Sequence, residues 1–123
     1  MPYLVIALGG ALGANTRYLV NLLFVRWLGA EFPYGTLVIN ITGSLVLGVF
    51  LTLATERAEL DPLWRLFFAT GFLGGYTTFS AYSYEAILLL REGAYGPAAM
   101  YVVGSVVGGL VGAWLGVALA RHW

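Results

Sequence analysis

Long apolar stretches dominate the pattern of hydrophobic and polar positions. Four of them, at residues 4–25, 36–55, 66–90 and 97–120, are separated by short polar segments. A helix needs about 20 predominantly apolar residues to cross the hydrocarbon of a bilayer, so each stretch is long enough to span it. The pattern therefore predicts an all-α integral membrane protein with four transmembrane helices, in which residues 1–123 form a single domain.

The composition supports this class and argues against several others. The chain is 60% hydrophobic and 10% charged, and its mean hydropathy is +0.85. It has no cysteine, which excludes disulfides and thiolate metal sites. No nucleotide-binding, zinc or hydrolase motif is present, and the only histidine is His122. We therefore expect no enzyme activity, no organic cofactor and no nucleic-acid partner.

The charge distribution gives almost no preferred orientation in the membrane. All six basic residues are arginines. With four spans, one side carries Arg57, Arg65 and Arg121, the other carries Arg26 and Arg91, and Arg17 lies within the first span. Because the positive-inside rule has little bias to act on, the chain can insert in both orientations, which permits an antiparallel dimer. The alternative is one orientation, set by the few arginines and the insertion machinery.

The third apolar stretch is the longest and contains an unusual polar segment. Gly74 and Gly75 are followed by Tyr76, Thr77 and Thr78, a combination of low helix propensity and hydroxyls that can bond freed backbone groups. This predicts a third helix that is broken in the middle of the membrane. The ends of two half-helices can hold a cation, an anion or both. The alternative is that the glycine pair serves close packing or a kink.

Three polar or charged side chains within or near the spans are candidates for a functional role. Asn40 is central in the second span, where it can cap the broken helix, donate to an anion or join two helices. Arg17 costs about 2.5 to 3.5 kcal/mol or more at the bilayer centre, so it must pair, face water or snorkel to the interface. A vestibule that attracts anions is the functional alternative for Arg17. Glu85 is either a functional intramembrane carboxylate or an interfacial residue.

Aromatic and glycine spacings predict two helix faces. Phe79 and Tyr82 lie three residues apart on one face, and the positive edges of two aromatic rings can solvate a small anion weakly, as conduction requires. Simple packing of these rings is the alternative. Glycine spacing also predicts close helix contacts, in the first span at Gly9 and Gly13 and in the fourth at Gly104, Gly108, Gly112 and Gly116.

Three segments together resemble the Fluc/CrcB family of fluoride channels, and the resemblance extends over the whole chain. They are GGALGANTRY at residues 9–18, GTLVINITGS at 35–44 and GFLGGYTTFS at 71–80. The resemblance implies a dual-topology antiparallel homodimer in the cell inner membrane that exports fluoride by passive electrodiffusion. It also implies two separate fluoride pathways and a structural Na⁺ on the two-fold axis.

The resemblance also assigns roles to individual residues. Backbone carbonyls of Gly74 and Thr77 from both subunits would hold the sodium, as hard ligands for a hard cation. Arg17 would line a vestibule. The fluoride pathway would be formed by Asn40, Phe79, Tyr82, Ser80, Thr36, Tyr101, Ser105 and Glu85.

The sequence departs from the usual TTFSTFS pattern of the family. Ala81 replaces a threonine, Tyr82 replaces the second phenylalanine, and Gly109 stands where serine or threonine is common. Two other functions are weighed against the channel. A small proton-coupled multidrug exporter needs a membrane carboxylate, typically in the first span, and residues 4–25 have none. A non-transporting scaffold subunit leaves Asn40 and the broken span without a purpose.

Overall fold

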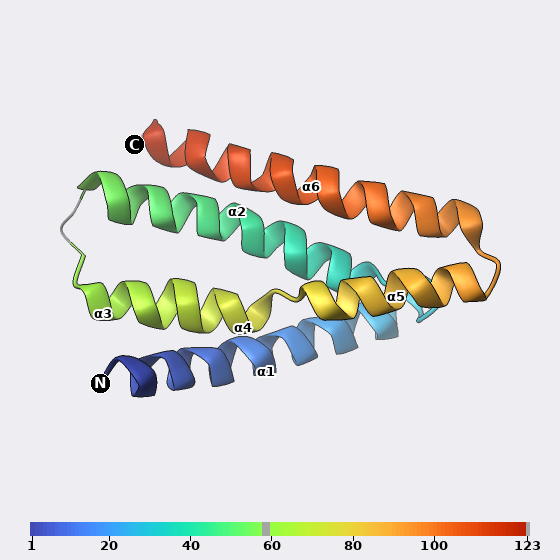
Figure 1. Cartoon of the computed structure of the whole chain (residues 1–123), viewed down its shortest axis with the longest axis horizontal. Helices are drawn as coiled ribbons and strands as arrows, with labels where there is room; N and C mark the ends of the chain where they lie inside the picture. Colours follow the sequence, from blue (N-terminus) through green and yellow to red (C-terminus); the bar gives the residue numbers. More distant parts are fainter. Residues whose placement is uncertain (58–59, 123) are drawn as a thin grey trace.

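The computed structural model describes residues 1–57 and 60–122, and every regular element among them is helical. The three uninterrupted long helices are α1 (Pro2–Leu28), α2 (Tyr34–Arg57) and α6 (Tyr95–Arg121). Between α2 and α6 lie α3 (Pro62–Arg65), the π-helical segment η1 (Leu66–Leu73), α4 (Gly74–Tyr76) and α5 (Phe79–Arg91). Figure 1 shows these helices running alongside one another, with the start of α1, the end of α2, the start of α3 and the end of α6 at the same end. The predicted all-α class is confirmed.

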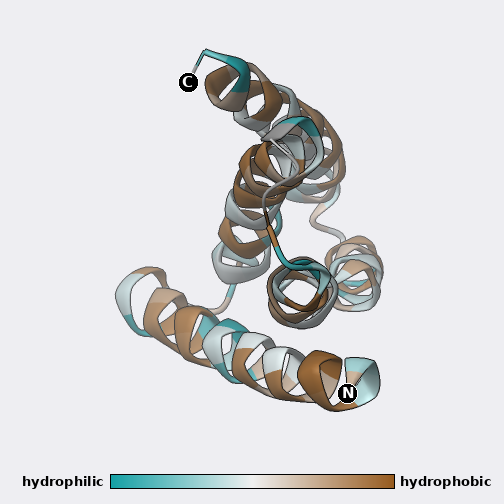
Figure 2. Ribbon diagram, turned by 90° about the vertical axis from the view of Figure 1, so that its left-hand side faces the viewer, coloured by the Kyte–Doolittle hydropathy of each residue, from teal (hydrophilic) through white to brown (hydrophobic). Residues whose placement is uncertain are grey.

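Two of the helices are long and apolar enough to cross a membrane, over Tyr34–Glu56 and Tyr95–Arg121. Only 11% of the most apolar window of each is buried inside the chain, so most of its apolar side chains face outward. Figure 2 shows hydrophobic residues along every helix rather than on one inward face only. The other two predicted spans correspond to α1 and to the series from α3 to α5. A four-span topology remains a prediction for these segments.

The series from α3 to α5 is interrupted at Thr77 and Thr78, which have extended backbone conformations. The N–H and the hydroxyl of Thr77 both donate to the Leu73 carbonyl, at 3.0 and 2.9 Å, where α4 ends. The Thr78 hydroxyl accepts from the N–H of Ala81 at 3.2 Å and so caps the start of α5. Gly74 and Gly75 are themselves helical. The helix therefore ends at the threonines and not at the glycines. The hydrogen bonds of Thr77 and Thr78 stabilise the end of α4 and the start of α5.

Glycines on both α1 and the third segment allow these two parts of the chain to approach very closely. A methyl group on Gly9 would overlap the Phe67 carbonyl oxygen, and one on Gly13 would overlap the Phe72 carbonyl. A methyl group on Gly75 would lie 2.7 Å from the carbonyl oxygen of Gly10. The predicted packing face of the first span is thus present. Gly75 itself serves close packing, the alternative role considered for the glycine pair.

The glycine stripe of α6 faces α2 over most of its length. A methyl group on Gly116 would overlap the Leu45 carbonyl oxygen, and one on Gly112 would lie 3.1 Å from the Ile41 carbonyl. A methyl group on Gly108 would lie 2.6 Å from Cδ1 of Ile41. Gly104 has no atom within 4 Å of such a methyl group. The prediction of a close helix along the stripe is correct for three of its four glycines and wrong, within this chain, for Gly104.

Replacing Gly116 by alanine should destabilise the protein, because the new methyl group meets backbone atoms of α2 that no side-chain rotation can move. Forced overpacking costs about 1 to 3 kcal/mol. Gly104→Ala is the matched control on the same helix and should be neutral or stabilising by up to about 1 kcal/mol, through better helix propensity. The measurement is thermal unfolding of both variants in detergent. Equal unfolding midpoints for the two variants would contradict the packing described.

Candidate functional site

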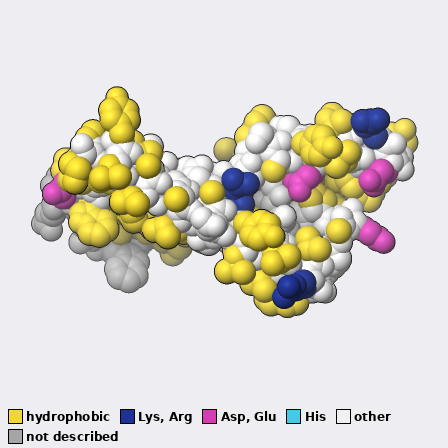
Figure 3. Space-filling view, turned by 90° about the horizontal axis from the view of Figure 1, so that it is seen from below, with side chains coloured by type: hydrophobic (Ala, Val, Ile, Leu, Met, Phe, Trp, Pro, Cys, Tyr) yellow, Lys and Arg dark blue, Asp and Glu magenta, His cyan; other side chains and the backbone are white. Residues whose placement is uncertain are grey.

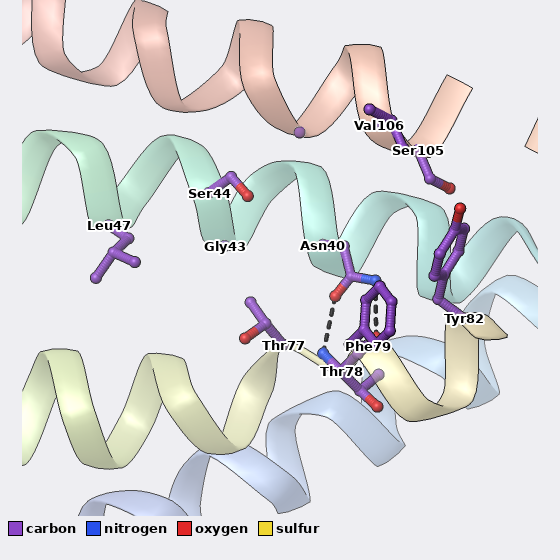
Figure 4. Close-up of a pocket in the computed structure, with 11 residues that line it drawn as sticks. Asn40, Gly43, Ser44, Leu47, Thr77, Thr78, Phe79, Tyr82, Ser105 and Val106 are labelled. Carbon is purple, nitrogen blue, oxygen red and sulfur yellow. Dashed lines mark hydrogen bonds between the residues drawn. The ribbon is translucent and has the colours of Figure 1, made fainter. Parts of the chain in front are cut away.

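A cavity of about 310 Å³ lies beside the interruption, between α2, α5 and α6. Figure 4 shows that side chains from these three helices and from the interruption itself meet there. Of the described residues that line it, none is charged. The lining comprises Asn40, Gly43, Ser44, Leu47, Thr77, Thr78, Phe79, Tyr82, Ser105, Val106 and Gly109. The cavity brings together five of the predicted site residues, namely Asn40, Thr77, Phe79, Tyr82 and Ser105.

Asn40 makes two hydrogen bonds to the backbone of Thr78 (Figure 4). Its Nδ2 donates to the Thr78 carbonyl at 3.0 Å, and its Oδ1 accepts from the Thr78 N–H at 2.9 Å. Both backbone groups have left the helical pattern, and leaving them unbonded away from water would be costly. Of the three roles considered for Asn40, the structure thus shows capping of the break. One N–H of the carboxamide remains for another acceptor.

Arg17 holds the same interruption from the opposite side. Its Nε donates to the Gly75 carbonyl at 3.1 Å, and the side chain is half-buried. In a continuous helix this carbonyl would accept the N–H of Phe79. The positive charge therefore lies at the C-terminal end of α4, where helix carbonyls favour a cation. Of the possibilities considered for Arg17, pairing with the protein is the one observed, and Arg17 does not line the cavity.

Aromatic rings form a continuous series that starts at the interruption. The ring centroids of Phe79 and Tyr82 are 5.6 Å apart at an interplanar angle of 51°. Tyr82 in turn lies 5.3 Å from Tyr101, and Tyr101 lies 5.6 Å from Phe32 in an edge-on arrangement. Tyr101 is fully buried, whereas Phe79 is 79% exposed. Phe79 therefore has little packing to do inside a single chain, which weakens packing as the explanation for its presence.

A second cavity, of about 490 Å³, lies near the α1–α2 connection and the end of α5. Glu85 lines this second cavity and not the first, together with Glu31 and Glu92. The Tyr101 hydroxyl donates to Oε1 of Glu85 at 3.0 Å. The series of rings through Tyr82 and Tyr101 thus connects the first cavity to a side chain of the second.

The remaining predicted pathway residues lie outside both cavities. Thr36 is 4% exposed, on α2. Ser80 is exposed on the first turn of α5, where its Oγ lies 3.3 Å from the Thr78 hydroxyl. Tyr101 is buried beneath Tyr82. None of the three is among the residues that line the first cavity.

Sequence reasoning missed two features of the site. It anticipated that the Thr78 hydroxyl could bond freed backbone groups, but not that Thr78 supplies the backbone groups that Asn40 binds. Gly43 lets α2 approach the interruption, because a methyl group there would overlap the Thr77 side chain. A threonine three residues before Ala81 was a detectable capping signal, whereas nothing near Gly43 in the sequence pointed to Thr77.

The backbone around the interruption has the groups that a cation would need. The N–H that would bond the Gly74 carbonyl in a continuous helix belongs to Thr78, and it binds Asn40 instead. The N–H that would bond the Thr77 carbonyl belongs to Ala81, and it binds the Thr78 hydroxyl instead. No group of three or more His, Asp or Glu residues in the described part of the chain could hold a metal. The Gly74 and Thr77 carbonyls therefore fit a cation held by backbone oxygens.

Comparison with known proteins gives matches over the stretch of the chain in which the site lies. The sequence model of the family described as CrcB-like protein, Camphor Resistance (CrcB), matches residues 4–117. A protein of Nitrobacter hamburgensis named fluoride-specific ion channel FluC 2 is 48% identical over 122 residues, which cover 99% of this chain and 98% of the relative. A fluoride-specific ion channel FluC of Solibacter usitatus is 46% identical, with 99% and 100% covered. Another, of Chloroflexus aurantiacus, is 49% identical over 118 residues, with 96% and 94% covered.

Proposed function

This chain belongs to the CrcB-like family, and from that premise we propose that it is a fluoride channel that exports fluoride passively across the cell inner membrane. The observation that carries the proposal is the interruption at Thr77 and Thr78, held by Asn40 beside an uncharged cavity. Its relatives are named fluoride-specific ion channels, and they cover nearly the full length of the chain.

The cavity favours an anion without binding it strongly. α5 begins at Phe79, which lines the cavity, and the N–H groups of Phe79 and Ser80 have no acceptor within the helix, whereas that of Ala81 binds the Thr78 hydroxyl. The second N–H of Asn40 and the hydroxyl of Ser105 add donors. No lining side chain is charged, so a fluoride ion meets hydrogen-bond donors and positive ring edges rather than a full opposite charge. Such moderate coordination allows an ion both to bind and to leave.

The other predicted residues extend the proposed route beyond the cavity. Thr36, Ser80, Tyr101 and Glu85 are proposed as polar stations, supported by the hydrogen bond from Tyr101 to Glu85. Arg17 is proposed to raise the local concentration of anions in a vestibule, because its Nη groups extend beyond the Nε that binds Gly75.

The working unit is proposed to be an antiparallel homodimer with Na⁺ on its two-fold axis. Figure 3 shows hydrophobic side chains over much of one face, with the charged side chains gathered mainly over its right-hand half. Gly74 is exposed, so a second subunit can reach its carbonyl. When bound, the sodium would offset the dipoles of the Gly74 and Thr77 carbonyls of both subunits.

Removal of sodium should weaken this dimer, because the carbonyls of the two subunits would then face one another without a cation between them. The protein would be extracted and purified with sodium replaced throughout by N-methylglucamine, and the dimer fraction measured on dilution in detergent. Addition of sodium chloride should restore the dimer, and N-methylglucamine chloride at the same ionic strength is the control. A dimer fraction that is indifferent to sodium would argue against the central cation.

The principal competing function is a small proton-coupled exporter, which would require a carboxylate that exchanges protons. Only Glu85 could serve, and it is half-buried and hydrogen-bonded to Tyr101. The test is fluoride movement into vesicles at symmetrical pH and with an imposed pH gradient, for the natural protein and for Glu85→Gln. A channel moves fluoride down its electrochemical gradient at symmetrical pH. Transport that needs the pH gradient and is lost in Glu85→Gln would favour the exporter.

A further inference from the structure

Two hydroxyl groups from different helices converge on the wall of the first cavity. Figure 4 shows the hydroxyl of Tyr82, on α5, and that of Ser105, on α6, turned toward one another. Both residues line the cavity. Ser105 Oγ is buried and has no hydrogen-bond partner among the described residues, so no hydrogen bond joins the two hydroxyls. Two donors thus point to one region without satisfying each other.

No other side chain among the described residues is hydrogen-bonded to Ser105 Oγ. The hydroxyl of Tyr101, whose ring packs against that of Tyr82, donates to Glu85. A buried hydroxyl without a partner is uncommon, and a bound ligand or water normally explains one. Gly109, which also lines the cavity, contributes no side chain that would fill the space. The Ser105 hydroxyl, which has no partner within the described part of the chain, is therefore available to a ligand in the cavity.

The position of the Tyr82 hydroxyl is fixed by its ring. The ring is packed between Phe79, at 5.6 Å, and Tyr101, at 5.3 Å, which limits its rotation. A donor held in place before the ion arrives loses little conformational freedom on binding, so it binds more tightly than a mobile one. Tyr82 differs in this respect from a phenylalanine, which would supply the same ring without a donor.

We propose that the hydroxyls of Tyr82 and Ser105 together form a two-donor site for one fluoride ion in the cavity wall. The proposal rests on the proposed channel function and adds a specificity-determining role for Tyr82. Fluoride accepts stronger hydrogen bonds than larger halides, because its charge is concentrated in a smaller ion. Two O–H donors at a fixed position thus favour fluoride over chloride.

The test compares Tyr82→Phe, Ser105→Ala and the double variant in the full-length protein reconstituted in liposomes. The initial rate of fluoride efflux is measured against fluoride concentration, with potassium fluoride as the ligand. Each single variant should raise the half-saturating concentration about tenfold, the equivalent of about 1.4 kcal/mol. The double variant should raise it by clearly less than the product of the two, because both donors serve one ion. Tyr84→Phe, on the exposed side of α5, is the control and should change nothing.

A second readout does not depend on transport. Fluoride should raise the thermal unfolding midpoint of the natural protein in detergent relative to equal chloride, because a ligand stabilises the state that binds it. Tyr82→Phe and Ser105→Ala should lose this difference. If both variants instead lower the midpoint equally in fluoride and in chloride, the two hydroxyls serve stability alone and the proposal is wrong.

These outcomes separate the two-donor site from the channel function. Rapid fluoride efflux with unchanged half-saturation in Tyr82→Phe would overturn the site and leave the channel intact. A fluoride-dependent unfolding shift that vanishes in both variants, without any efflux from the natural protein, would support the site and overturn the channel.

Discussion

Fluoride flux should be abolished when Asn40 is replaced by aspartate. The carboxylate can still accept the Thr78 N–H, but it cannot donate to the Thr78 carbonyl, which then faces a negative oxygen. The negative charge of the aspartate would also lie on the wall of the cavity, where it repels a fluoride ion. Two like charges about 4 Å apart at an effective dielectric constant of about 20 repel by about 4 kcal/mol. That energy corresponds to a decrease in anion occupancy of roughly a thousandfold.

The measurement is fluoride efflux from liposomes that contain Asn40→Asp, after its dimer has been shown to elute as the natural protein does. Asn15→Asp is the matched control, since Asn15 lies on α1 and bonds only to the Ala11 carbonyl of its own helix. It introduces the same charge away from the cavity and should conduct normally. Efflux through Asn40→Asp within tenfold of the natural rate would contradict the role given to the carboxamide.

The second large effect is expected for Phe79→Ile, which should lower fluoride flux by about a hundredfold or more. Isoleucine keeps an apolar side chain but removes the positive ring edge that can face an anion. It also removes the aromatic contact with Tyr82 at 5.6 Å. Folding of the single chain should be little affected, because Phe79 is 79% exposed and does not belong to the buried core. A loss of flux with a nearly unchanged unfolding midpoint is therefore the expected signature.

Tyr84→Ile provides the control for this substitution. Tyr84 lies on the same helix, is 66% exposed and does not line the cavity. The same loss of an aromatic ring there should leave fluoride flux within about twofold of the natural rate. Equal losses in the two variants would assign the effect to α5 as a whole and would remove Phe79 from the pathway.

Much of the fold follows from local patterns that the sequence displays directly. Apolar stretches long enough to span a bilayer predict the helices, and glycines four residues apart predict that another helix lies close to α6, which the structure shows to be α2. The position of the interruption could not be predicted from helix propensity. Gly74 and Gly75 are weaker helix formers than threonine, yet both remain helical, with Gly75 packed against Gly10. The hydrogen bonds of Thr77 and Thr78 decide where the helix ends.

The candidate site was predicted in its residues better than in its contacts. Membrane depth and aromatic spacing made Asn40 and Phe79 candidates but left packing roles open, and the family resemblance assigned both to the pathway. The pairing of Arg17 with Gly75 joins residues far apart in the chain, and no local signal records which carbonyl an interruption will free. For the same reason, spacing could not show that Glu85 lines a different cavity from Asn40, although both belong to the predicted pathway.

The central claim is that this chain alone conducts fluoride passively and selectively. The most direct measurement is ion efflux from liposomes reconstituted with the purified protein, followed with a fluoride electrode and, in parallel, with a chloride electrode. We predict rapid release of fluoride and no release of chloride above that of protein-free liposomes. Well-folded dimers that release no fluoride, or that release both ions at similar rates, would contradict the account.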